Sequence, residues 1–182
     1  MNNYIEYVEA NPSSPIEDQM SLAAYHEAGH FVIAELLGFK ILDARIMAPA
    51  AYNSPGAQLG YVNAKWPNAQ PVSLEETTDP EELRAQALLF IGGSVGVILI
   101  GEHGLDTVYA DMSEPDMDGL HTCIQNLIPA ASESEKRATV HNFAFEAFQL
   151  LQPHQDRIRE VATELYDNAG QTPPNLFPKA AQ

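Results

Sequence analysis

Two histidines four residues apart constrain this chain more than any other feature of its sequence. His26 and His30 enclose the segment Glu27-Ala28-Gly29, and apolar residues recur at helical spacing on both sides of them. On an α-helix, positions i and i+4 lie on one face, so both imidazoles are able to reach a single ion. We therefore expect a helix over residues 21–38 that carries a pair of metal ligands.

The glutamate between the histidines adds a chemical function to this pair. The 3.6-residue period turns Glu27 by about 100° around the helix axis from His26, so its carboxylate reaches a water molecule without taking a metal position. The pattern H-E-x-x-H is typical of zinc metalloproteases, in which the glutamate accepts the proton of the attacking water. We therefore expect His26 and His30 to bind Zn²⁺ and Glu27 to be the catalytic base.

The composition indicates which binding partners and which cellular compartment to expect. Nine Lys and Arg stand against 25 Asp and Glu, and the formal net charge is −16. Nucleic acids and anionic membrane surfaces attract positive charge, so neither is an expected partner.

The single cysteine, Cys123, excludes an internal disulfide and a multi-cysteine zinc cluster. The longest apolar run, residues 87–101, is shorter than the roughly 20 residues that cross a bilayer, and no secretion signal is evident. We expect a soluble, cytoplasmic protein.

Periodicity and turn signals predict one mainly α-helical domain with a small β ribbon. We expect an acidic N-terminal arm over residues 1–20, the domain over 21–172 and a C-terminal tail over 173–182. Strand-like segments follow the first helix at residues 41–47 and 59–62. Capping and proline signals place further helices at residues 79–101, 115–127, 132–151 and, after a break at Pro153, 158–165.

The segment Ala24-Tyr25-His26-Glu27-Ala28-Gly29-His30 resembles the peptidase domain of the FtsH-type, AAA+ ATP-dependent zinc metalloproteases. The resemblance covers residues 21–172 and implies a helical, zincin-like metallopeptidase fold. It continues in chain order through Ile46-Met47-Ala48-Pro49, Leu59-Gly60-Tyr61, Ile91-Gly92-Gly93 to Ile100-Gly101-Glu102, Ser113 to Leu120, and Ala147 to Leu165.

The resemblance also implies the third zinc ligand, which a catalytic zinc site needs in addition to the two histidines. In the family this ligand is an aspartate at the start of a later helix, followed by a hydrophobic residue. Asp116, which Met117 follows, fits this description best, and Asp118 and Asp111 are the alternatives. The remaining histidines have no paired spacing that would make them ligands: His103, His121, His141 and His154.

The chain departs from the family in two respects. It contains no G-x-x-x-x-G-K-[ST] phosphate loop, so ATP-driven unfolding would come from a separate partner ATPase or be absent. Val97 and Ile98 stand where the family usually has an acidic pair.

We expect a zinc metalloendopeptidase that acts on peptides or unfolded protein without its own ATPase. The implied assembly is a homo-oligomer or a complex with a partner ATPase. The alternatives are a catalytically silent zinc-binding module for interaction or regulation, and a metal-free helical protein with a fortuitous motif.

Overall fold

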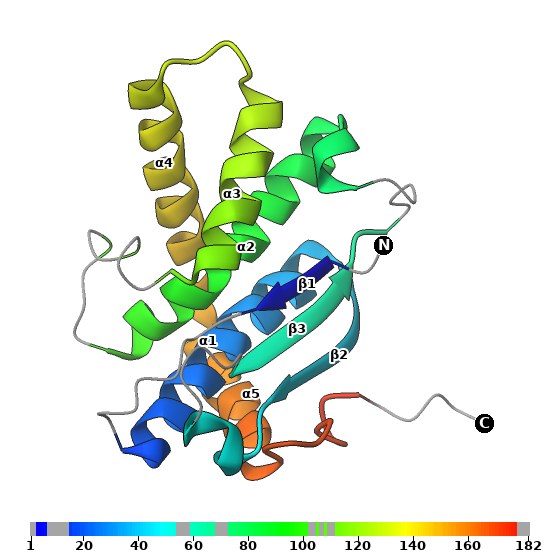
Figure 1. Cartoon of the computed structure of the whole chain (residues 1–182), viewed down its shortest axis with the longest axis vertical. Helices are drawn as coiled ribbons and strands as arrows, with labels where there is room; N and C mark the ends of the chain where they lie inside the picture. The colour runs from blue at the N-terminus through cyan, green and yellow to red at the C-terminus, as the bar shows by residue number, and fades with distance from the viewer. Residues whose placement is uncertain are drawn as a thin grey trace.

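The structure, a computed structural model, describes residues 3–6, 15–53, 59–67, 73–101, 105, 108 and 112–177. It is mainly helical with a small antiparallel sheet, which confirms the expected fold class (Figure 1). The helices are α1 (Ile16–Leu37), α2 (Pro80–Ile100), α3 (Glu114–Leu127), α4 (Glu133–Leu151) and α5 (Gln155–Asp167). The strands are β1 (Asn3–Glu6), β2 (Lys40–Ile46) and β3 (Gly60–Lys65).

Most helix ends lie where the capping signals predict them. The side chain of Asp79 caps α2, and Pro80 occupies its first turn. Ser132 and Glu135 form a reciprocal capping box at the start of α4. Gly38 ends α1 in the left-handed conformation, with φ of 78°, which glycine adopts without steric strain. Local chemistry therefore fixes these boundaries before any long-range packing is considered.

The two ends of the chain are more closely integrated into the fold than the sequence predicts. Helix α1 begins at Ile16 instead of residue 21, and its Gln19 and Met20 are buried. Near the other end, Leu176 is buried and the ring of Phe177 packs edge-on against Phe31. Residues 16–20 thus extend the helix, and the described part of the tail contacts it.

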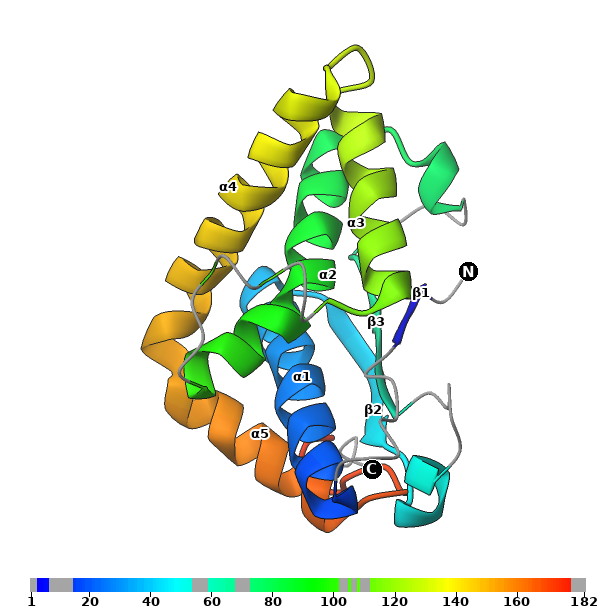
Figure 2. The same cartoon turned by 60° about the vertical axis from the view of Figure 1, so that its left-hand side comes forward.

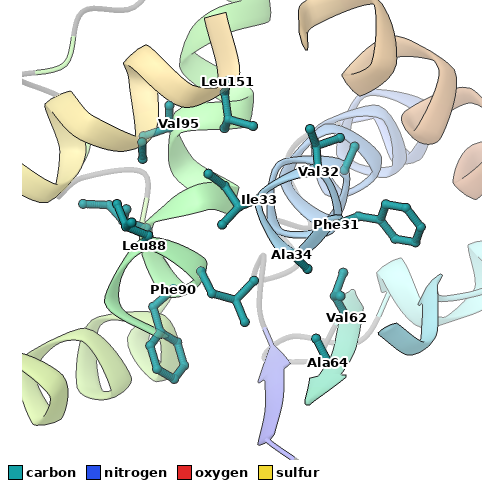
Figure 3. Packing of buried hydrophobic residues seen from close by; sticks show 14 of the residues in the cluster. Phe31, Val32, Ile33, Ala34, Val62, Ala64, Leu88, Phe90, Val95 and Leu151 are labelled. Atoms are coloured by element: carbon teal, nitrogen blue, oxygen red, sulfur yellow. The ribbon is translucent and has the colours of Figure 1, made fainter. Parts of the chain in front are cut away.

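The sheet has the strand order β1-β3-β2, and both pairs are antiparallel. The paired segments β2 and β3 match the predicted ribbon, whereas β1 was not predicted. Val62 and Ala64 of β3 are buried and lie on the side of the strand that faces α1 (Figure 3). The sheet therefore covers one side of α1, and α5 lies on the opposite side (Figure 2).

Helices α1 and α2 form the centre of the molecule, and each has an unbroken run of buried residues, 26–34 in α1 and 85–96 in α2. Among the described residues, α2 is the one helix long and apolar enough to cross a membrane, contrary to the expectation from residues 87–101 alone. However, 78% of its apolar window is buried, because α1, α3 and α4 pack around it. Burial inside the fold therefore accounts for its composition.

Candidate metal centre

Helix α1 places the two histidines of the motif on the face that it turns toward α2. His26 and His30 are both buried, and their rings lie edge to face with centroids 4.7 Å apart. The Nε2 atoms of the two rings are 3.0 Å apart. The i and i+4 spacing has therefore brought both nitrogens to one point, as the sequence predicts.

The first turn of α3 brings Asp116 to the same point. Its Oδ2 atom lies 3.1 Å from Nε2 of His26 and 3.4 Å from Nε2 of His30. Zinc bonds of about 2.0–2.1 Å at tetrahedral angles place neighbouring ligand atoms about 3.3 Å apart. The three atoms therefore have the separations that one tetrahedral ion requires, and this buried group could hold a metal ion.

Hydrogen bonds to neighbouring groups orient the candidate ligands. Nδ1 of His30 donates to the backbone carbonyl of Leu89 over 2.7 Å, so Nε2 of the neutral ring carries the lone pair. The hydroxyl of Ser113 donates to Oδ2 of Asp116 over 2.7 Å and accepts from its backbone N–H. Nε2 of His30 thus faces a carboxylate oxygen, an arrangement that a metal cation or a proton between them stabilises.

The charge environment keeps Asp116 ionised even though its side chain is fully buried. Burial acts to raise the pKa of this carboxyl group. The charge of His30 and hydrogen bonds with His26 and His30 outweigh burial and hold the pKa at about 2. The other carboxylate oxygen, Oδ1, is buried and has no hydrogen-bond partner among the described residues. A buried carboxylate with an unsatisfied oxygen is a suitable cation ligand.

Gly93 of α2 leaves open the space in front of the imidazoles. A Cβ atom at this position would lie 2.4 Å from Nε2 of His30 and 2.6 Å from Nε2 of His26. Any side chain would therefore collide with the atoms that face the candidate ion. Gly93 was not among the predicted site residues, and its closeness to both rings gives it a physical role in the site.

Glu27 is also buried and directly follows His26 in α1, but its carboxylate is not part of the group of three. A Cβ atom on Gly60, at the start of β3, would be 2.7 Å from Oε1 of Glu27. Tyr52 is close enough for the charge of Glu27 to add to burial in raising the pKa of its phenol. Gly60, the first residue of β3, therefore leaves space for the carboxylate of Glu27.

The other candidates from the sequence lie elsewhere or outside the described residues. Asp118 is exposed on α3, as is His121, and His141 is exposed on α4. Burial raises the pKa of the Cys123 thiol to about 12, and this residue belongs to the core. Asp111 and His103 lie outside the described residues. Of the three aspartates considered, the structure brings Asp116 to the histidines.

The chain was compared with protein-family models and with curated proteins. No protein-family model matches the chain, and no curated protein matches it. The chemistry of the site is therefore inferred from its own residues.

Proposed function

We propose that this chain is a zinc-dependent metallopeptidase that hydrolyses peptide bonds in peptides or unfolded protein. The observation that carries the proposal is a buried glutamate, Glu27, which directly follows His26 in α1, together with the buried His26–His30–Asp116 group. Two imidazoles and one carboxylate leave a fourth position of a zinc ion open, as in catalytic sites. A purely structural zinc site is closed and has no use for a neighbouring base.

The roles of the residues follow from their chemistry. Zinc bound by the three ligands would polarise the substrate carbonyl and lower the pKa of a water molecule. Glu27 would accept the proton of a water molecule as the water oxygen joins the carbonyl carbon, and it would then give this proton to the amine nitrogen as the C–N bond breaks. Ser113 and the Leu89 carbonyl hold Asp116 and His30 in the orientation that binding requires.

The test combines metal analysis with three variants of the full chain. We expect about one zinc per chain and hydrolysis of casein or a fluorogenic peptide by the zinc-loaded protein. Glu27→Gln should retain zinc and lose hydrolysis, because an amide cannot accept the proton. Asp116→Ala should lose zinc, whereas the matched variant Asp118→Ala on the exposed side of α3 should retain it.

Three results would overturn the proposal. Zinc binding without hydrolysis of either substrate would favour a zinc-binding interaction module. Iron in the purified protein, with no hydrolysis after zinc loading, would point to redox chemistry, since two histidines and one carboxylate also suit iron. A folded protein that binds no metal would leave the histidine motif without a chemical role.

A further inference from the structure

The strand β3 connects the candidate active site to the N-terminal segment of the chain. It begins at Gly60, whose backbone lies against the carboxylate of Glu27. On one side β3 pairs with β2, and on the other it pairs with β1. Without β1, the second side of β3 would be an open edge with unpaired backbone N–H and C=O groups, which is a template for another extended chain.

The position of β1 relates this edge to the metal ligands. The strand lies between β3 and α3, and it contacts α3, whose first turn carries Asp116 (Figures 1 and 2). In the antiparallel register Asn3 faces Ala64 and Glu6 faces Tyr61. The chain in β1 therefore runs along β3 toward Gly60 and Glu27. An extended peptide in the same place would also be directed toward these groups.

We infer that this edge of β3 is the peptide-binding site of the metal centre and that β1 occupies it as an internal competitor. The inference rests on the proposed function, since it assigns the substrate position for that activity. Backbone pairing recognises any extended chain with little dependence on its side chains, so the substrate class is unfolded or flexible peptide. The net charge of −16 favours segments that are neutral or basic.

The shortness of β1 makes it displaceable. It offers four facing residue pairs, and a backbone hydrogen bond contributes only about 1 kcal/mol net. A peptide that binds the same edge has to displace this segment, so its apparent affinity is reduced by the fraction of molecules in which the edge is open. Weakening β1 should therefore strengthen peptide binding, whereas fixing it in place should prevent binding.

The first experiment weakens β1 in the full chain. The double variant Tyr4→Pro/Ile5→Pro removes two successive backbone donors, one of which must face β3 in an antiparallel ladder. The matched control, Tyr4→Phe/Ile5→Val, keeps both donors and the preference for a strand. Binding of a fluorescein-labelled, unstructured, basic decapeptide is measured by anisotropy on the zinc-loaded Glu27→Gln background. We expect the proline variant to lower Kd at least about fivefold and the control to leave it unchanged.

The second experiment fixes β1 in place reversibly. Tyr4 and Asn63 face each other across the ladder, and facing Cα atoms in antiparallel strands lie within the range that a disulfide spans. Tyr4→Cys with Asn63→Cys should lose peptide binding on oxidation and recover it on reduction with a phosphine. The native Cys123 is buried and does not interfere. The single variants, treated in the same way, should show no change.

The outcomes separate this inference from the proposed function. An unchanged Kd in the proline variant overturns the inference and makes β1 a permanent strand of the sheet, whether or not the protein hydrolyses casein. Tighter peptide binding by the proline variant without hydrolysis by the zinc-loaded chain supports the edge as a peptide site and rejects the peptidase. The proline variant decides the question by itself if the engineered disulfide does not form.

Discussion

Helix α1 contacts α2 and α5 on two different sides, and the two contacts differ in how much space they leave. Toward α2, a Cβ atom on Gly29 would lie 2.2 Å from the backbone oxygen of Gly92, so the two backbones touch. Toward α5, Ala24 of α1 and Ala162 of α5 line a pocket of about 230 Å³. At Gly29, on the side that bears the proposed metal ligands, there is thus no room for a methyl group, whereas the other side has room for several atoms at Ala24 and Ala162.

The difference follows from what each contact has to achieve. Two imidazoles can meet a ligand from α3 across α2 only if the backbones of α1 and α2 approach closely, and glycines permit this approach. The contact with α5 buries an apolar stripe, and many side chains serve that purpose. Its stripe consists of Ile158, Val161, Ala162 and Leu165. Tolerance to substitution should therefore differ sharply between the two sides of one helix.

The largest expected effect is on metal binding by Gly93→Ala. The new methyl group would lie within 2.6 Å of both Nε2 atoms, in the space that the ion would share. We expect the zinc affinity to fall at least about 100-fold, or roughly 2.8 kcal/mol. Competition with a chromogenic chelator measures the affinity, and circular dichroism establishes that the variant is folded.

Gly92→Ala is the matched control for that substitution. A Cβ atom on Gly92 would meet Ile33 and the backbone of Gly29, with no imidazole atom among its nearest contacts. This variant should lose stability but keep its zinc affinity in the folded protein. Equal losses of affinity in both variants would show that the helix contact as a whole, and not the space at Gly93, governs metal binding.

The same difference between local patterns and long-range contacts determines which parts of the fold the sequence predicts. The amphipathic stripe of α5 and the caps of α2 and α4 are local patterns, and the expected helices are confirmed there. The start of α1 was placed too late because Asn11-Pro12-Ser13-Ser14-Pro15 indicates a linker, although the helix begins directly after Pro15. The strand β1 is too short for an alternating pattern, and only its pairing with β3 reveals it.

Within the site, the sequence favours Asp116 over Asp118, but the structure gives a different reason for this preference. Helical spacing in the sequence predicts that Met117, Leu120 and Ile124 share the buried stripe of α3. In the structure Met117 is only partly buried, and Asp116 itself lies on the stripe with Leu120, Cys123 and Ile124. The spacing i, i+4, i+7, i+8 from Asp116 could have revealed this. The contacts of Gly60 and Gly93 could not have been predicted, because they join segments far apart in the chain.

The next largest effect is expected for the stability of Gly29→Ala. Alanine favours helix over glycine by up to about 1 kcal/mol, but its methyl group would meet the Gly92 backbone oxygen, which no rotamer change can move. Overpacking of this kind costs about 1–3 kcal/mol, and we expect a net loss of about 2 kcal/mol in the free energy of unfolding. Urea denaturation of the metal-free protein measures it. A variant as stable as the natural chain would contradict the tight contact.

A smaller effect is expected at the rim of the α5 contact. Arg157 donates two hydrogen bonds to the two carboxylate oxygens of Glu35, over 3.0 and 2.7 Å, and its guanidinium lies over the ring of Phe31. Lysine cannot form the paired hydrogen bonds, so Arg157→Lys should lose about 0.5–1 kcal/mol. A double-mutant cycle with Glu35→Gln, repeated at high salt, isolates the pair. A loss of stability in Arg157→Lys that shows no coupling to Glu35→Gln would indicate packing on Phe31 as its source.

The smallest effect is expected in the pocket between α1 and α5. A substitution there tests the difference between the two sides of α1 most directly. Ala162 is buried but lines the pocket between α1 and α5. Ala162→Met adds more volume there than Gly29→Ala adds on the other side, yet methionine favours helices, and its flexible chain fits irregular spaces. We expect the free energy of unfolding to change by less than about 0.5 kcal/mol and zinc affinity to stay the same. If this variant lost as much stability as Gly29→Ala, both sides of α1 would be equally intolerant, and the close approach of α2 would no longer distinguish the side that holds the metal ligands.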